Sequence, residues 1–138
     1  MAESAHSVRE QGYFAPVSDA TYMLLTTFRR NGQPVPTPVH VVTDAAASAA
    51  YFRTWDVSGK AKRMRHTAQV EIAPSTLRGR PLRPALKAEA SLLTGEQSVQ
   101  AAHLIAARHP ILHGRLIPWY HRLRGWTTQQ YRLTPPPG

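Results

Sequence analysis

Residues 21–42 read Thr21-Tyr22-Met23-Leu24-Leu25-Thr26-Thr27-Phe28-Arg29-Arg30-Asn31-Gly32-Gln33-Pro34-Val35-Pro36-Thr37-Pro38-Val39-His40-Val41-Val42. The first eight are mostly β-branched, aromatic or large aliphatic residues, which favour a strand over 21–28. Asn31-Gly32 follows, and because both residue types readily take positive φ, they predict a tight hairpin turn. A second extended segment is expected over 34–42. Its three alternating prolines lack backbone donors on the same side, so we expect that side of the strand to make no N–H bonds there.

The remaining sequence alternates short extended segments with helical ones. A helix over 60–66, with Ser58 as its N-cap, separates a third strand over 49–55 from a fourth over 69–74. The other predicted elements are a short helix and loop in 1–20, a loop over 44–48, a turn over 76–81, a long fifth strand over 82–94, a helix over 95–109 with Val99, Ala102, His103 and Ala106 on one face, a helical piece in 111–123 and a closing strand over 125–133. This order predicts a mainly β fold with α, a six-stranded antiparallel barrel with flanking helices.

Length and composition indicate one soluble domain. The chain has 138 residues, of which 42% are apolar, and this is enough for a single core that we take to span 1–138. It contains no cysteine, no signal-peptide pattern and no apolar segment long enough to cross a membrane. These features predict a cytoplasmic protein with no membrane partner.

The net charge of +9 predicts an anionic partner. Residues 53–87 hold nine lysines and arginines but only two acidic residues. Nucleic acid, anionic lipid and a phosphate-bearing small molecule all suit such a field, so the charge by itself does not choose among them.

The turn Ser58-Gly59-Lys60 is the best candidate for an anion site. A strand end, hydroxyl groups, a glycine and a helix N-terminus carrying a lysine together make a cradle for phosphate. A capped helix with a solvated basic face has the same local sequence, so this turn alone leaves both interpretations open.

The sequence lacks the motifs that mark several other functions. The chain has no Gly-x-Ser-x-Gly or P-loop pattern and no paired carboxylates, which argues against hydrolases and nucleoside triphosphatases. His109 and His113 are four residues apart, but Pro110 interrupts the helix that would align them, and we expect no metal site. The basic helix over 60–66 contains no aromatic residue for base stacking, so we expect no nucleic-acid partner.

For two groups of side chains, the sequence leaves two interpretations open. His40 either contacts a ligand from the second strand or is an ordinary hydrogen-bonded barrel residue. Trp119, Tyr120 and Trp126 either form the wall of a substrate pocket or belong to the core, and buried aromatic rings are more often core.

The run from Leu25 to Val39, followed by Ser58-Gly59-Lys60-Ala61-Lys62-Arg63, resembles the split β-barrel flavin and deazaflavin oxidoreductases, which are relatives of pyridoxamine 5′-phosphate oxidase. The similarity continues through residues 70–74, 78–80 and 122–126 and spans roughly residues 20–134. Individual matches are weak, but their order and spacing are specific.

The resemblance implies a homodimer with two equivalent cofactor sites at the subunit interface. The cofactor phosphate would lie at the turn Ser58-Gly59-Lys60, with Arg53, Thr54 and Arg63 as neighbours. Thr37-Pro38-Val39 would lie along the tricyclic ring. Hydride passes directly between cofactor and substrate in such proteins, so no catalytic side chain is expected.

Within this family the sequence is most similar to the branch that uses the deazaflavin coenzyme F420. The FMN branch binds phosphate through an arginine and a lysine on the second strand, and residues 35–42 lack that basic pair. The resemblance therefore implies an F420-dependent oxidoreductase acting on an unsaturated or reducible small molecule. An FMN-dependent oxidoreductase and a flavin- or haem-binding carrier without turnover remain the alternatives. Surplus basic residues would meet the oligoglutamate tail of F420; they are Lys62, Arg65, Arg78, Arg80 and Arg83.

Overall fold

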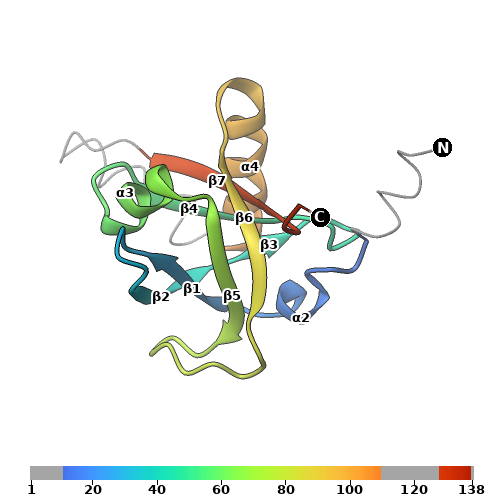
Figure 1. Ribbon diagram of the computed structural model, residues 1–138. Helices are drawn as coiled ribbons and strands as arrows, with labels where there is room; N and C mark the ends of the chain where they lie inside the picture. The colour runs from blue at the N-terminus through green and yellow to red at the C-terminus, as the bar shows by residue number, and fades with distance from the viewer. Residues whose placement is uncertain (1–10, 110–127, 138) are drawn as a thin grey trace.

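The computed structural model describes residues 11–109 and 128–137, and these residues form one curled antiparallel sheet with helices around it (Figure 1). The strands run in the order β2-β1-β5-β6-β7-β4-β3. Their bounds are β1 Tyr22–Phe28, β2 Pro34–His40, β3 Val42–Thr43, β4 Ala50–Trp55, β5 Gln69–Ser75, β6 Leu86–Leu92 and β7 Thr128–Thr134. The helices are α2 Ala15–Ser18, α3 Gly59–His66 and α4 Gly95–Arg108.

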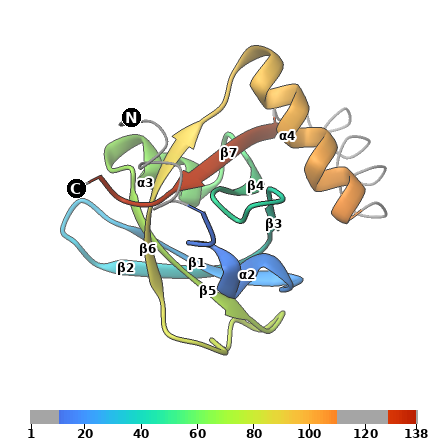
Figure 2. The same cartoon turned by 90° about the vertical axis from the view of Figure 1, so that its right-hand side faces the viewer.

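The connection between β2 and β3 explains how the sheet curls. These strands lie at opposite ends of the strand order, yet only Val41 separates them in sequence. The chain therefore passes directly from one edge of the sheet to the other, which requires the two edges to approach each other as in a barrel (Figure 2). Val41 itself is 1% exposed, so this crossing point belongs to the core.

The predicted hairpin is confirmed. β1 pairs with β2 from Tyr22 opposite His40 to Phe28 opposite Pro34, and Gly32 in the turn has a φ of 88°. Among the described residues, β2 pairs only with β1 and ends the strand order. Within this part of the chain, the side of β2 that faces away from β1 thus has no strand partner, as its alternating prolines predict.

The helices α3 and α4 also follow the prediction. Ser58 caps α3, because its Oγ accepts a hydrogen bond of 3.1 Å from the backbone N–H of Ala61. In α4 the buried residues are Ala101 and Ile105, four residues apart, and the helix packs against β4 and β7. Val99 is exposed, so the core-facing side of α4 is the one with Ala101 and Ile105.

The core fills the interior of the curled sheet. Its largest buried side chains come from β1, β4, β5 and β7, and from the segment that includes α2. They include Phe14, Met23, Leu25, Phe52, Ile72 and Leu133. Phe52 stacks on Tyr131 with ring centroids 5.3 Å apart, which joins β4 to β7.

Two strand predictions need correction. The fifth strand was expected over 82–94, but β6 begins only at Leu86, because Pro84 supplies no backbone donor for a ladder. The described residues form seven strands where the sequence predicts six, since the end of the second extended segment forms the separate strand β3.

The predictions for residues 111–123 and for Trp119, Tyr120 and Trp126 lie outside the described residues. Within residues 11–109 and 128–137, no helix is long and apolar enough to cross a membrane.

Candidate functional site

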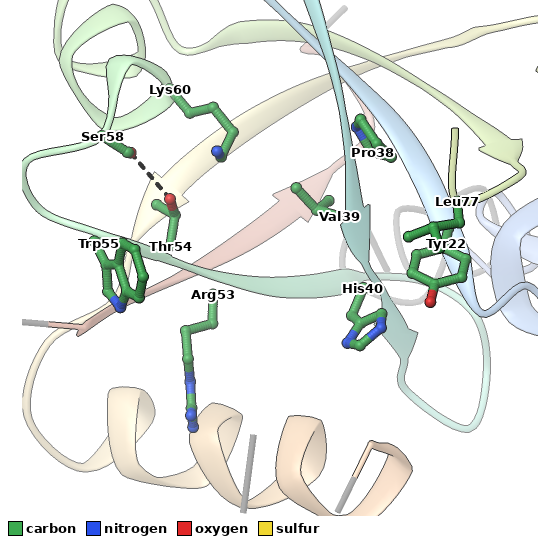
Figure 3. Close-up of a pocket in the computed structure, with 10 residues that line it drawn as sticks. All are labelled: Tyr22, Pro38, Val39, His40, Arg53, Thr54, Trp55, Ser58, Lys60 and Leu77. Carbon is green, nitrogen blue, oxygen red and sulfur yellow. Dashed lines mark hydrogen bonds between the residues drawn. The ribbon is translucent and has the colours of Figure 1, made fainter. Parts of the chain in front are cut away.

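An open cavity of about 340 Å³ lies between β2 and β4, beside the start of α3 (Figure 3). β2 contributes its last three residues, β4 contributes its last three, and the capped turn contributes Ser58 and Lys60. The lining residues are Tyr22, Pro38, Val39, His40, Arg53, Thr54, Trp55, Ser58, Lys60 and Leu77. The cavity thus lies where the two edges of the sheet approach each other.

The start of α3 is tied to β4 by hydroxyl groups. Ser58 Oγ lies 2.9 Å from Thr54 Oγ1 and also accepts the hydrogen bond from Ala61 that caps the helix. The backbone N–H of Ser58 donates to the carbonyl of Trp55 at 3.0 Å, which closes the turn. The helix N-terminus and Lys60 therefore have a defined position at the cavity wall.

The charges around the cavity favour an anion. Burial lowers the pKa of Lys60, and the neighbouring positive charge of Arg63 lowers it further. Burial also lowers the pKa of Arg53. None of the lining residues carries a carboxylate that would compensate these charges. A half-buried cation beside a helix N-terminus stabilises a bound phosphate or carboxylate.

Six of the nine site residues predicted from the sequence line this cavity, namely Pro38, Val39, Arg53, Thr54, Ser58 and Lys60. Thr37, Gly59 and Arg63 do not.

Arg63 is one turn further along α3 and turns toward β1, where its Nε donates to Thr27 Oγ1 at 2.5 Å. Its guanidinium also covers Gly59: a Cβ at position 59 would lie 2.7 Å from Arg63 Nη1. Gly59 therefore leaves room for Arg63, which the sequence pattern did not indicate.

Four lining residues were not predicted as site residues: Tyr22, His40, Trp55 and Leu77. Of these, Tyr22 is opposite His40 in the β1–β2 ladder, and the two rings lie 4.9 Å apart. Trp55 follows Arg53 and Thr54 on β4. The two residues predicted on this strand could therefore have indicated that Trp55 lies beside the same cavity. Leu77 comes from the loop after β5, and no sequence pattern points to it.

The ring of His40 also stacks on that of His109, with centroids 4.2 Å apart and an interplanar angle of 12°. His109 is buried at the end of α4, and its Nε2 lies 3.0 Å from the carbonyl oxygen of Val41. This contact holds the end of α4 against the β2–β3 crossing. Tyr22, His40 and His109 thus form a stack of three rings beside the cavity.

The imidazole of His40 is neutral at physiological pH. Burial, followed by the positive charge that His109 can carry, lowers the pKa of His40 to about 4. Burial is also the main cause that lowers the pKa of His109, although its contact with Val41 acts in the opposite direction. His40 therefore presents an uncharged ring to the cavity.

This lowered pKa predicts a loss of stability in mild acid. Between about pH 6.5 and pH 4 the unfolded chain binds a proton at His40 that the folded protein does not, so the free energy of unfolding should fall as the pH falls through that window. Urea unfolding at several pH values measures this slope. His40→Gln should reduce it, and Gln100→Ala on the exposed side of α4, which changes no titratable group, should not. An unchanged slope in His40→Gln would show that His40 does not titrate as described.

No protein-family model matches the chain, and no curated protein matches its sequence. Solved structures do match. HutZ, the haem storage protein from Vibrio cholerae, has a TM-score of 0.65 at 16% identity, over 96% of this chain and 90% of that one. A putative pyridoxamine 5′-phosphate oxidase from Listeria innocua has a TM-score of 0.62 at 14% identity, over 94% of both chains. The fold is a split β-barrel.

A third structure of this split β-barrel type is larger. It is a protein of unknown function from Agrobacterium tumefaciens, with a TM-score of 0.66 at 18% identity over 94% of this chain. The present chain spans about half the length of that protein, because the match covers 53% of it. At these identities the likeness establishes the fold, and the function has to be argued from the cavity.

Proposed function

We propose that this split β-barrel binds the deazaflavin coenzyme F420 in the cavity between β2, β4 and α3, and transfers a hydride between it and an unsaturated or reducible small molecule. One observation carries the proposal: the capped helix start with Lys60 and the proline-interrupted edge of β2 face the same cavity. The first suits a phosphate and the second suits a planar ring.

The phosphate end of the site would be formed by Ser58, Lys60 and the first N–H groups of α3. Its charge balance supports this assignment, because Lys60 is half-buried and no lining residue neutralises it. Arg53, also half-buried and lining the same cavity, adds a second positive charge. A phosphate dianion bound there would relieve the repulsion between Lys60 and Arg63 that lowers the pKa of Lys60.

The ring end would be formed by Pro38 and Val39. Proline has no backbone donor, so at this point the outer side of β2 is open to an apolar ring face without losing a hydrogen bond. Trp55 and Leu77 supply further apolar surface. Leu77 is 64% exposed at the rim of the cavity. The proposal includes a homodimer with the two sites at its interface, in which the partner subunit would cover this rim.

The bound coenzyme would supply the hydride, and the protein would orient the substrate above the ring and exclude water. No residue of the cavity needs to act as nucleophile or general base for this reaction. F420 is preferred over FMN because residues 35–42 lack the basic pair with which the FMN branch binds phosphate.

A haem-binding carrier is the second candidate, and His40 favours it. Its imidazole lines the cavity and is neutral, which is the form that coordinates iron. One matching structure is a haem storage protein.

Purification from a host that makes F420 distinguishes these functions. The F420 proposal expects the protein to retain the visible absorption of the deazaflavin. A Soret band would instead support the haem carrier, and an FMN spectrum would support the FMN-dependent oxidoreductase. Protein that copurifies with either of these chromophores, and binds no F420 on titration, would overturn the proposal.

A further inference from the structure

A second cavity, of about 520 Å³, lies at the other end of α3. The β1–β2 turn supplies one wall, and the end of α3 with the start of β5 supplies the other. Its lining residues are Phe28, Arg29, Arg30, Gly32, His66, Thr67 and Gln69. We call it the hairpin cavity. It shares no lining residue with the cavity assigned to the coenzyme.

The hairpin cavity is positively charged. Arg29 and Arg30 both line it, and none of its lining residues has a carboxylate. Arg63 adds a third guanidinium nearby: its pKa is lowered first by burial and then by the positive charge of Arg29. Positive charges that lower each other's pKa favour a bound anion, which would reduce their repulsion.

Two of these guanidinium groups are held by acceptors that carry no negative charge. Arg30 Nε and Nη2 lie 3.2 Å and 3.1 Å from His66 Nε2, which accepts from the arginine because a guanidinium has no acceptor atom. Arg63 donates to the hydroxyl of Thr27. These contacts restrict both side chains without cancelling their charge, which lowers the entropy lost when an anion binds.

The other walls suit a small ligand. Gly32 carries no side chain, and a Cβ built on it meets nothing within 4 Å, so its backbone is open. Thr67 and Gln69 add polar side chains, and Phe28 adds one aromatic surface. The volume falls in the range of small-molecule sites.

We propose that the hairpin cavity is a second anion site, independent of the coenzyme, which binds a small ligand through phosphate or carboxylate oxygens. Arg30 binds the anion with its remaining N–H groups, and Arg29 supplies a second positive charge. His66 positions Arg30.

The test titrates the whole protein with inorganic phosphate and, separately, with citrate, and follows backbone amide signals by NMR. Saturable shifts should appear at Gly32, Thr67 and Gln69 with at least one of the two anions. The anion that binds more tightly identifies the ligand as a phosphate or a carboxylate. Loss of one charge-assisted contact in Arg30→Gln should weaken this binding about tenfold.

Arg78→Gln is the matched control, because it removes the same charge from an exposed loop outside both cavities. It should leave the affinity unchanged. Equal weakening in Arg78→Gln, or an absence of saturable shifts at the three amides with both anions, would overturn the proposal.

Lys60→Ala separates this site from the coenzyme site. It should weaken F420 binding and leave the anion shifts at Gly32 and Thr67 intact, whereas Arg30→Gln should do the reverse. If Lys60→Ala abolished the shifts at both residues, the hairpin cavity would not be an independent site. If F420 did not bind to the protein, the proposed function would fail, but the anion shifts would still test the hairpin cavity.

Discussion

Phe52→Ala should lower the free energy of unfolding by about 3–5 kcal/mol, the usual cost of removing a buried aromatic ring. Phe52 is 0% exposed, and its ring stacks on Tyr131 between β4 and β7. The substitution removes this contact and leaves a cavity in the core on which the site strand β4 is built. Urea unfolding followed by circular dichroism measures the change.

Two variants make this result interpretable. Phe52→Leu retains most of the apolar volume and should cost less than Phe52→Ala, so it keeps the comparison possible if the alanine variant does not fold. Val57→Ala is the control, because Val57 is 49% exposed and should change stability by less than about 0.5 kcal/mol. A cost below about 1 kcal/mol for Phe52→Ala would contradict the placement of this ring in the core.

Lys60→Ala should weaken coenzyme binding by about 10- to 100-fold, because it removes one charge-assisted contact to the phosphate. The half-buried ammonium lines the cavity, and Ser58 holds the helix that carries it. The dissociation constant of F420 for the two proteins is measured by fluorescence titration at fixed ionic strength.

Lys87→Ala is the matched control for this experiment. Lys87 has the same charge and lies on β6, but it is exposed, does not line the cavity and is not among the residues expected to meet the oligoglutamate tail. Its substitution should leave the affinity for F420 nearly unchanged apart from a small effect that salt screens. Equal losses in the two variants would mean that the general positive field, and not a defined cradle, binds the coenzyme.

Short-range chemistry explains why the β1–β2 hairpin and the start of α3 were predictable. Gly32 at positive φ, the unpaired side of β2 and the Ser58 cap each follow from the residue types within a few positions. Pro84 acts over the same short range, because it supplies no ladder donor and β6 begins only after it, at Leu86.

Contacts between distant segments explain what was missed. The single residue between β2 and β3 takes the chain from one edge of the sheet to the other, and no local pattern signals such a crossing. The stack of His40 on His109 joins residues 69 positions apart. The resemblance implies that Arg63 is a neighbour of the phosphate, whereas its guanidinium donates to Thr27 on β1.

The cavity between β2, β4 and α3 is the centre of the proposed function, and amide NMR tests it most directly. Added F420 should shift the signals of Val39, Thr54, Ser58 and Lys60 most strongly, with smaller changes at the hairpin cavity. Largest shifts at other residues, or no saturable shift at these four amides, would contradict the assignment of this cavity to the coenzyme.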